Sequence, residues 1–335
     1  MATYTGWKYK LLEMRHRAKE LLLTVQIACK SSHMQKPVSD QPLLIAMVDG
    51  ESFHGGMCDR FKGIISLYAY CKLHQLPFRI RYTYPFRLED FLIPADYDWT
   101  LHPGEYTDNP LFIRVLYMRG EHYATRLLRL RPKRQIHFYT NRDLLPHINE
   151  AFHDKLPGGE AYDWGALYRE LFKPGKELQE HIDRITGEIG GEYDALVFRF
   201  QNLLGDFKEY HYKALEDKSE AEQLLEKCIG YVQQRKKVSS DKKLLVTSDS
   251  TTFLKWVSQI QGVYVIPGTL THMDGAKLQG DQSKAHGAYM KSFLDFYMIS
   301  KAQRVYRVGT EKMYNSAFPV FAAKINERPF ESITL

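Results

Sequence analysis

Two segments of this sequence place polar residues directly after apolar runs, where they could bind a phosphorylated ligand. The run 244–246 ends in Thr247-Ser248-Asp249, whose hydroxyls and carboxylate can hydrogen-bond ribose or base N–H groups. Arg199 follows a second apolar run, and its guanidinium needs an anion there, either a structural carboxylate or a ligand pyrophosphate. Such residues are typical of nucleotide sites in α/β folds, although an Asp after a strand also occurs for packing or capping alone.

Two further segments join small residues to the start of a helical pattern. Gly55 and Gly56 precede a helix that carries Arg60, and paired glycines allow the backbone to approach a phosphate at a helix N-terminus. The loop is neither a Walker loop nor the G-x-G-x-x-G fingerprint of dinucleotide enzymes.

The second of these segments, the turn Asn315-Ser316-Ala317, opens another helix. Its backbone amides could hold a phosphate, or Ser316 could simply be an N-cap.

A transfer reaction at such a site also needs a group that takes a proton from the acceptor. From position we predict Glu51 as the catalytic base, with Asp49, His54 and Asp206 as alternatives, because carboxylates and imidazoles perform this role. No Asp-x-Asp motif ends a strand, so we predict no metal ligand and no cofactor besides a donor substrate.

The elements that would position these residues alternate regularly between strand and helix. In the first half we expect a helix over 7–30, strands over 43–48 and 78–84, and a helix over 57–76 between them. The stretch 85–174 is harder to assign, with possible strands at 111–117 and 135–140. We expect helices over 164–172, near its end, and over 177–189. The second half predicts strands over 194–200, 244–247, 263–267 and 304–308, and helices over 219–236, 252–260, 288–301 and 318–324.

This order predicts an α/β fold of two Rossmann-like domains whose parallel sheets face an interdomain cleft. We place the boundary at Gly190-Gly191, which gives an acceptor-side domain over 1–190 and a donor-binding domain over 191–335.

Composition excludes several classes of protein. The net charge of +6 is modest and dispersed, its densest part being 126–134, so we expect no nucleic-acid partner. The four cysteines lack C-x-x-C spacing, and no apolar run is long enough to span a bilayer, so we expect a cytoplasmic protein. The amphipathic helix over 7–30 packs on its domain in our main interpretation; peripheral contact with the inner face of the membrane, or with an oligomer, is the alternative.

The second half resembles the GDP-fucose-dependent fucosyltransferase superfamily, which includes the α1,6- and protein O-fucosyltransferases. The likeness lies in the order of Arg199, the Thr247-x-Asp249 segment, Asp295 within a helix and the turn 314–316. With the Gly-Gly loop it covers roughly residues 43–82 and 194–325. The resemblance implies a GT-B architecture and fucosyl transfer with inversion, usually without a metal ion.

The resemblance also implies roles for individual residues. Arg199 matches the arginine of the family's His-x-Arg motif, which contacts the donor β-phosphate; the histidine of that motif is Val197 here. Asp249 matches an acid near the nucleoside, and the residue after it is Ser250. Asp295 matches a helical acid that reads the guanine edge.

In the same comparison, Ser316 and the amides of Asn315 and Ala317 match a turn that cradles phosphate. We therefore predict a glycosyltransferase for polysaccharide biosynthesis that moves fucose or a related hexose from a GDP-sugar to a glycan or oligosaccharide acceptor. The alternatives are a nucleotide-sugar-binding protein without catalysis and an unrelated two-domain α/β enzyme, such as an epimerase or a phosphate-ester hydrolase.

Overall fold

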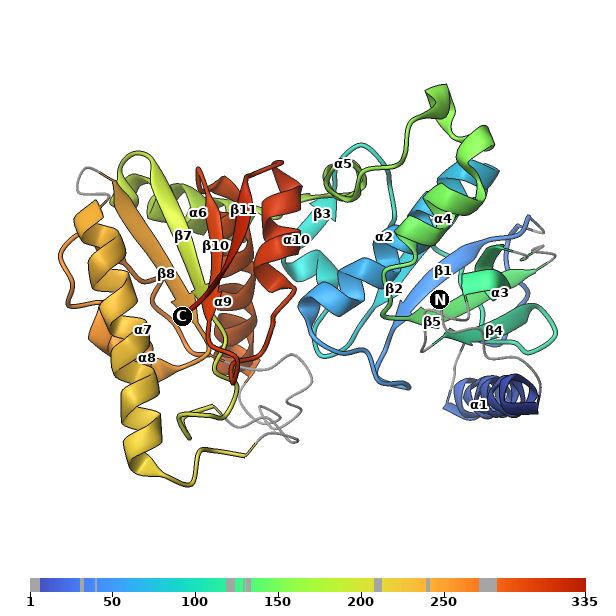
Figure 1. Cartoon of the computed structure of the whole chain (residues 1–335). Coiled ribbons are helices and arrows are strands. Elements are labelled where there is room, and N and C mark those ends of the chain that lie inside the picture. The colour runs from blue at the N-terminus through green and yellow to red at the C-terminus, as the bar shows by residue number, and fades with distance from the viewer. Residues whose placement is uncertain are drawn as a thin grey trace. The chain divides into compact units, whose positions relative to one another are not determined.

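The structure, a computed structural model, describes residues 7–30, 33–39, 41–118, 124–128, 130, 134–207, 213–238, 242–270 and 282–335. The chain divides into two compact units, Met1–Lys173 and Pro174–Leu335 (Figure 1). Of the basic run noted above, Arg129 and residues 131–133 lie outside the described part.

The centre of the first unit is a parallel sheet of four strands, β1 (Leu44–Val48), β2 (Phe78–Tyr82), β4 (Ile113–Met118) and β5 (Gln135–Thr140). Their order is β2-β1-β5-β4, and all pairs are parallel. The chain leaves β1 for β2 on one side and later returns to β5 on the other. The carboxyl ends of β1 and β5 therefore flank the point where the winding reverses, which is where α/β sheets bind ligands.

Helices cover this sheet on both faces. Helix α2 (Met57–His74) starts directly after Gly56 and ends at Gln75, which adopts a left-handed conformation. Helix α1 (Trp7–Lys30) packs along β4. The remaining elements of the unit are short: η1 (Leu88–Asp90), β3 (Leu92–Pro94), α3 (Ala124–Leu128), α4 (Leu145–Ala151), η3 (His153–Lys155), η4 (Pro157–Gly159), α5 (Trp164–Leu171) and β6 (Phe172–Pro174), which pairs with β3.

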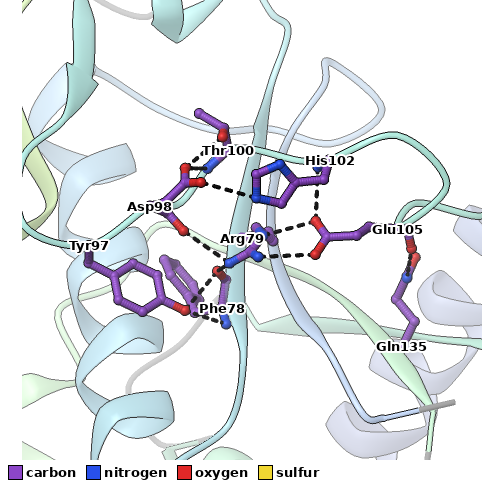
Figure 2. A network of polar contacts seen from close by, with 8 residues as sticks. All are labelled: Phe78, Arg79, Tyr97, Asp98, Thr100, His102, Glu105 and Gln135. Carbon is purple, nitrogen blue, oxygen red and sulfur yellow. Dashed lines mark hydrogen bonds and ion pairs between the residues drawn. The ribbon is translucent and has the colours of Figure 1, made fainter. Parts of the chain in front are cut away.

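A polar network fixes the long loop between β3 and β4 against the amino ends of the strands. Figure 2 shows Arg79 of β2 held by both carboxylate oxygens of Glu105, at 2.9 and 3.0 Å, and by the carbonyl of Asp98. Glu105 also accepts from the amide of His102, and its carbonyl accepts from the Gln135 side chain. These contacts join the loop over 98–105 to strands β2 and β5 through a partly buried ion pair.

The second unit contains a five-stranded parallel sheet of β7 (Tyr193–Phe198), β8 (Lys243–Ser248), β9 (Val263–Tyr264), β10 (Val305–Gly309) and β11 (Phe330–Thr334). Their order is β11-β10-β7-β8-β9. The chain runs outward from β7 through β8 to β9 and then returns to β10, so the winding reverses between β7 and β10.

The helices of the second unit are α6 (Lys176–Ile189), α7 (Lys218–Val238), α8 (Thr251–Val257), α9 (Gln282–Lys301) and α10 (Phe318–Ile325). Helices α7 and α8 cover one face of the sheet and share an apolar core with β7, β8 and β10. Helices α6, α9 and α10 lie on the other face, where α9 packs on both of its neighbours (Figure 1). The α/β fold with two parallel, Rossmann-like sheets is thus confirmed.

The observed elements follow the predicted ones closely, and the main differences concern the domain boundary, strand β9 and several short elements. Helix α6 precedes the boundary predicted at Gly190-Gly191 but belongs to the second compact unit. Strand β9 has two residues, against the five predicted over 263–267. Among the described strands and α-helices, five had no counterpart in the prediction: β3, β6, α3, α4 and β11. Of these, β11 is a largely exposed edge strand without a continuous apolar run.

Candidate functional site

At the carboxyl ends of β7 and β8, Arg199 forms an ion pair with Asp249, the Nη1–Oδ2 distance being 2.9 Å. The arginine side chain is 21% exposed and that of the aspartate 5%. The Arg199 guanidinium also lies over the Phe207 ring, 5.0 Å from its centroid. The sequence allowed either a structural carboxylate or a ligand pyrophosphate as the partner of Arg199. In the structure the partner is the carboxylate of Asp249.

Asp249 also organises the loop that follows β7. Its two oxygens accept the backbone amides of Phe200 and Gln201 at 2.8 and 2.7 Å. Burial raises the pKa of Asp249 above its usual value, although Arg199 and these amides favour the charged form. The carboxylate predicted to contact the nucleoside therefore holds Arg199 at the sheet edge; its nucleoside contact stays a prediction.

The row of side chains just inside this edge comes from three adjacent strands. Arg307 of β10, Val197 of β7 and Thr247 of β8 are register partners, so they project from the same face of the sheet. Thr247 is buried, and its hydroxyl oxygen has no hydrogen-bond partner among the described residues. Ser248, whose hydroxyl accepts the amide of Ser250, is also buried.

The turn at the end of β10 is held by two local contacts. The hydroxyl of Ser316 accepts the amide of Phe318 at 3.2 Å, and its carbonyl accepts from Arg307 at 3.1 Å. Asn315 and Ala317 flank it at the start of α10. Ser316 therefore satisfies the amide of the first residue of α10, but the N-cap itself is Ala317, so the simple capping interpretation is wrong by one residue. The contact of Ser316 with a phosphate stays a prediction.

Asp295 on α9 is paired with a residue that the sequence analysis did not single out. The ammonium of Lys291, one turn earlier, contacts both Asp295 oxygens at 2.5 and 2.6 Å, and both residues are buried. Burial raises the pKa of Asp295 above its usual value despite this neighbour. The available signal was a Lys and an Asp four residues apart within the mostly apolar segment 288–299 of the helix. The predicted guanine contact of Asp295 would have to form beside Lys291.

Arg60 fixes the glycine loop of the first unit. It is buried; its Nε donates to the Gly55 carbonyl at 2.9 Å, and its Nη1 donates to Tyr82 and to the Tyr84 carbonyl. Gly55 has a positive φ of 72°, and a Cβ there would lie 2.8 Å from Asp59. The loop requires glycine at this position, and Arg60 joins it to the end of β2. Contacts of Gly55, Gly56 and Arg60 with the donor stay predictions.

The proposed bases differ in how they are engaged. Burial would raise the pKa of Asp49, but nearby His54 and the hydrogen bonds from the Tyr139 hydroxyl and the Glu51 amide outweigh it and hold the pKa below its usual value. The Tyr139 hydroxyl donates to Asp49 at 2.7 Å, and buried His54 lies 3.8 Å from it. A stabilised carboxylate of this kind is a weak base.

Glu51 lies two residues beyond Asp49 and is more accessible. Its side chain is 24% exposed and pairs with the ammonium of Lys30 at 2.8 Å. The fourth candidate, Asp206, accepts the hydroxyl of Ser250, which is the N-cap of α8, and the Thr252 amide in the first turn of that helix. Glu51 thus stays our predicted base, and Asp206 is engaged in capping.

A cavity of about 380 Å³ lies at the amino ends of the first unit's strands, away from the carboxyl ends that carry Glu51, Gly55 and Gly56. Leu43, Pro77, Arg79 and Gln135 are among its lining residues, and none of the predicted site residues lines it. Within the described ranges, no three His, Cys, Asp or Glu side chains are grouped so that they could hold a metal ion.

Comparison with known proteins places this arrangement in a structural class. No protein-family model and no curated protein matches the chain. Among solved structures, the chain is similar to NodZ α-1,6-fucosyltransferase soaked with GDP-fucose, with a TM-score of 0.51 and 12% identity over 86% of this chain and 93% of NodZ. The selenomethionine form of NodZ from Bradyrhizobium matches with a TM-score of 0.50 and 11% identity over 85% and 92%.

The chain is therefore an α/β protein of two Rossmann-like units with the fold of the GT-B fucosyltransferases. The resemblance seen in short sequence motifs is confirmed at the level of the fold. At this identity the likeness shows the fold alone.

Proposed function

We propose that the chain is a glycosyltransferase that uses a GDP-sugar, with fucose or a related hexose as the transferred group. The observation that carries the proposal is the position of Arg199 at the reversal point of a sheet whose fold is shared with NodZ. The Ser316 turn at the neighbouring strand end, and the hydroxyl of Thr247, add polar groups on the same side.

In this proposal the residues of the second unit act on the leaving group. Departure of the nucleoside diphosphate builds negative charge on its phosphates, and Arg199 with the amides at the start of α10 would stabilise that charge. Asp249 orients Arg199 and the loop behind it. Glu51 would take the proton from the acceptor hydroxyl, as an inverting single displacement requires. A glycan acceptor, a role in polysaccharide synthesis, a cytoplasmic location and independence from metal ions complete the proposal and rest on the sequence.

The first test is thermal unfolding of the full chain with GDP, UDP, CDP and their sugars, with and without EDTA. A ligand that binds only the native state raises the unfolding temperature by mass action. We expect GDP to give the largest shift, and EDTA to leave it unchanged. Absence of a shift with every nucleotide would overturn the proposal, and a shift lost in EDTA would overturn the metal-independent mechanism.

The second test follows release of GDP from GDP-fucose with a mixed glycan acceptor pool. Arg199→Ala should lower kcat by about 10²- to 10³-fold, as expected for loss of a group that stabilises transition-state charge. Arg304→Ala is the matched control, because Arg304 is exposed at the amino end of β10 in the same sheet. GDP binding without turnover in the wild-type chain would favour a non-catalytic binding protein.

A further inference from the structure

Helix α1 has two apolar faces, of which only one packs on its own unit. Leu23 and Ile27 are buried against the sheet, His16 stacks on Tyr117, and Glu20 accepts the Tyr117 amide. The other face exposes large apolar side chains to solvent, at 42 to 70% of their area: Trp7, Leu11, Met14, Leu21, Leu22 and Val25.

These exposed residues form one continuous stripe. Positions 7, 11, 14, 18, 21 and 25 are spaced by three and four residues, with Ala18 completing the series, so they share one side of the helix along about 27 Å. Six of the fourteen exposed large apolar residues in the described part of the chain lie on this helix. An apolar surface concentrated in this way marks an interaction site.

Charge identifies the kind of partner. The segment 7–30 contains six basic residues, at positions 8, 10, 15, 17, 19 and 30, and two acidic ones, Glu13 and Glu20. Glu13 pairs with Arg17, Glu20 is turned toward β4, and Lys30 pairs with Glu51 of the loop after β1. By helical spacing, basic positions 8, 15 and 19 lie along one edge of the stripe and positions 10 and 17 along the other. The flanks of the stripe are therefore positive, and a second copy of the same helix would bring cations against cations. An anionic surface complements them.

We propose that α1 lies along the surface of a bilayer that contains anionic lipids, with its exposed stripe at the boundary between headgroups and acyl chains. A helix with one apolar stripe, basic flanks and a Trp binds membranes in this way. None of the described helices has the length and hydropathy to cross a membrane. The inference uses none of the predicted site residues and does not depend on the proposed function.

Flotation of the full chain with vesicles tests this inference. We expect binding to phosphatidylcholine vesicles that contain about one third phosphatidylserine, weak binding to phosphatidylcholine alone, and loss of binding at high salt. The double variant Leu11→Glu with Leu21→Glu should lower the partition coefficient on the order of tenfold or more. Leu111→Glu is the matched control, since Leu111 is 75% exposed in the same unit but lies outside α1.

No binding to the anionic vesicles, or equal loss in the Leu111→Glu control, would overturn the inference. Light scattering supplies an independent readout: a dimer that becomes monomeric in the double variant, without vesicle binding, would assign the stripe to a second copy instead. The GDP-induced thermal shift of the same variants should equal that of the wild type, which separates this inference from the fate of the proposed function.

Discussion

At the end of β7, Arg199 reaches an anion that the protein itself supplies. Asp249 holds this guanidinium and two backbone amides at once, so one buried carboxylate determines the course of the loop after β7. The sequence indicated a carboxylate at the strand end but could not show which way its oxygens turn. That direction depends on contacts with residues about fifty positions away in the chain.

Replacing Asp249 by Ala should lower the free energy of unfolding by about 3–5 kcal/mol, because an arginine and two buried amides lose their acceptor. Urea unfolding followed by fluorescence measures this change. Asp183→Ala, at an exposed position of α6, is the control and should change stability by less than about 0.5 kcal/mol. A change below about 1 kcal/mol at position 249 would contradict the organising role of this carboxylate.

His137 makes the first unit sensitive to acid. Burial lowers the pKa of this histidine from 6.5 to about 4, and its Nδ1 has no hydrogen-bond partner among the described residues. Below pH 6.5 His137 becomes protonated in the unfolded chain, whereas in the native state it stays neutral until about pH 4. The free energy of unfolding therefore falls as the pH falls from 6.5 to about 4. The expected loss is about 3 kcal/mol.

Urea unfolding of the wild type and of His137→Gln at several pH values between 7 and 4 measures this effect. The difference in free energy between the two proteins should shrink or reverse as the pH falls, because glutamine does not titrate. A difference independent of pH would show that His137 is protonated equally in both states.

At Gly63, helix α2 lies so close to the end of strand β5 that no side chain fits between them. A Cβ added at Gly63 would lie 2.2 Å from the carbonyl oxygen of Thr140, which is backbone and cannot turn aside. This contact brings the helix start and the glycine loop against the end of β5. The sequence showed a glycine inside a helical pattern, which is unfavourable by itself, but did not show what it faced.

Gly63→Ala should therefore destabilise the chain by about 2 kcal/mol or more through overpacking. The same substitution at Gly230, in α7, is the control: a Cβ there meets nothing within 4 Å, and alanine should stabilise the helix by about 1 kcal/mol. Opposite signs in thermal unfolding are the expected result. Equal effects at the two positions would argue against close packing of α2 on β5.

The sequence predicted most elements because buried parallel strands read as continuous apolar runs and the helices between them keep a regular period. The strands β1, β7 and β8 are buried along nearly their whole length and were predicted within one or two residues at each end. Edge strand β11 is largely exposed, and its apolar and polar residues do not alternate regularly, so its sequence pattern resembles that of a loop. The middle of the first unit could not be traced, because its short elements depend on contacts with distant loops, such as that of Arg79 with Glu105.

At the scale of the whole molecule, two sheets reverse their winding beside a predicted functional loop. Residues 49–56 follow β1 at one reversal point, and Arg199 follows β7 at the other. The sequence could place the site at these strand ends because ligands bind there in α/β folds generally. It could not distinguish residues that contact a ligand from those that hold the loops, as Arg60 and Asp206 do.

The two units have separate cores, so calorimetry should resolve two unfolding transitions. GDP should raise the transition of the second unit, which contains Arg199, Thr247 and Ser316, by several degrees at a concentration of about 100 Kd. Trp256 reports on the second unit, and Trp99 and Trp164 on the first, so fluorescence can assign each transition. A shift confined to the first unit would contradict the predicted donor site.

The coupling of Arg199 to Asp249 has a consequence for directed evolution. A saturation library at position 249 scored by activity would return almost only aspartate. That result would suggest that the ligand requires this residue, although the need to hold Arg199 and the β7 loop would be enough to produce it. Libraries aimed at a new sugar or base should keep both residues and vary the turn 314–317 instead, where the neighbouring side chains are more exposed and substitutions leave the β7 loop intact.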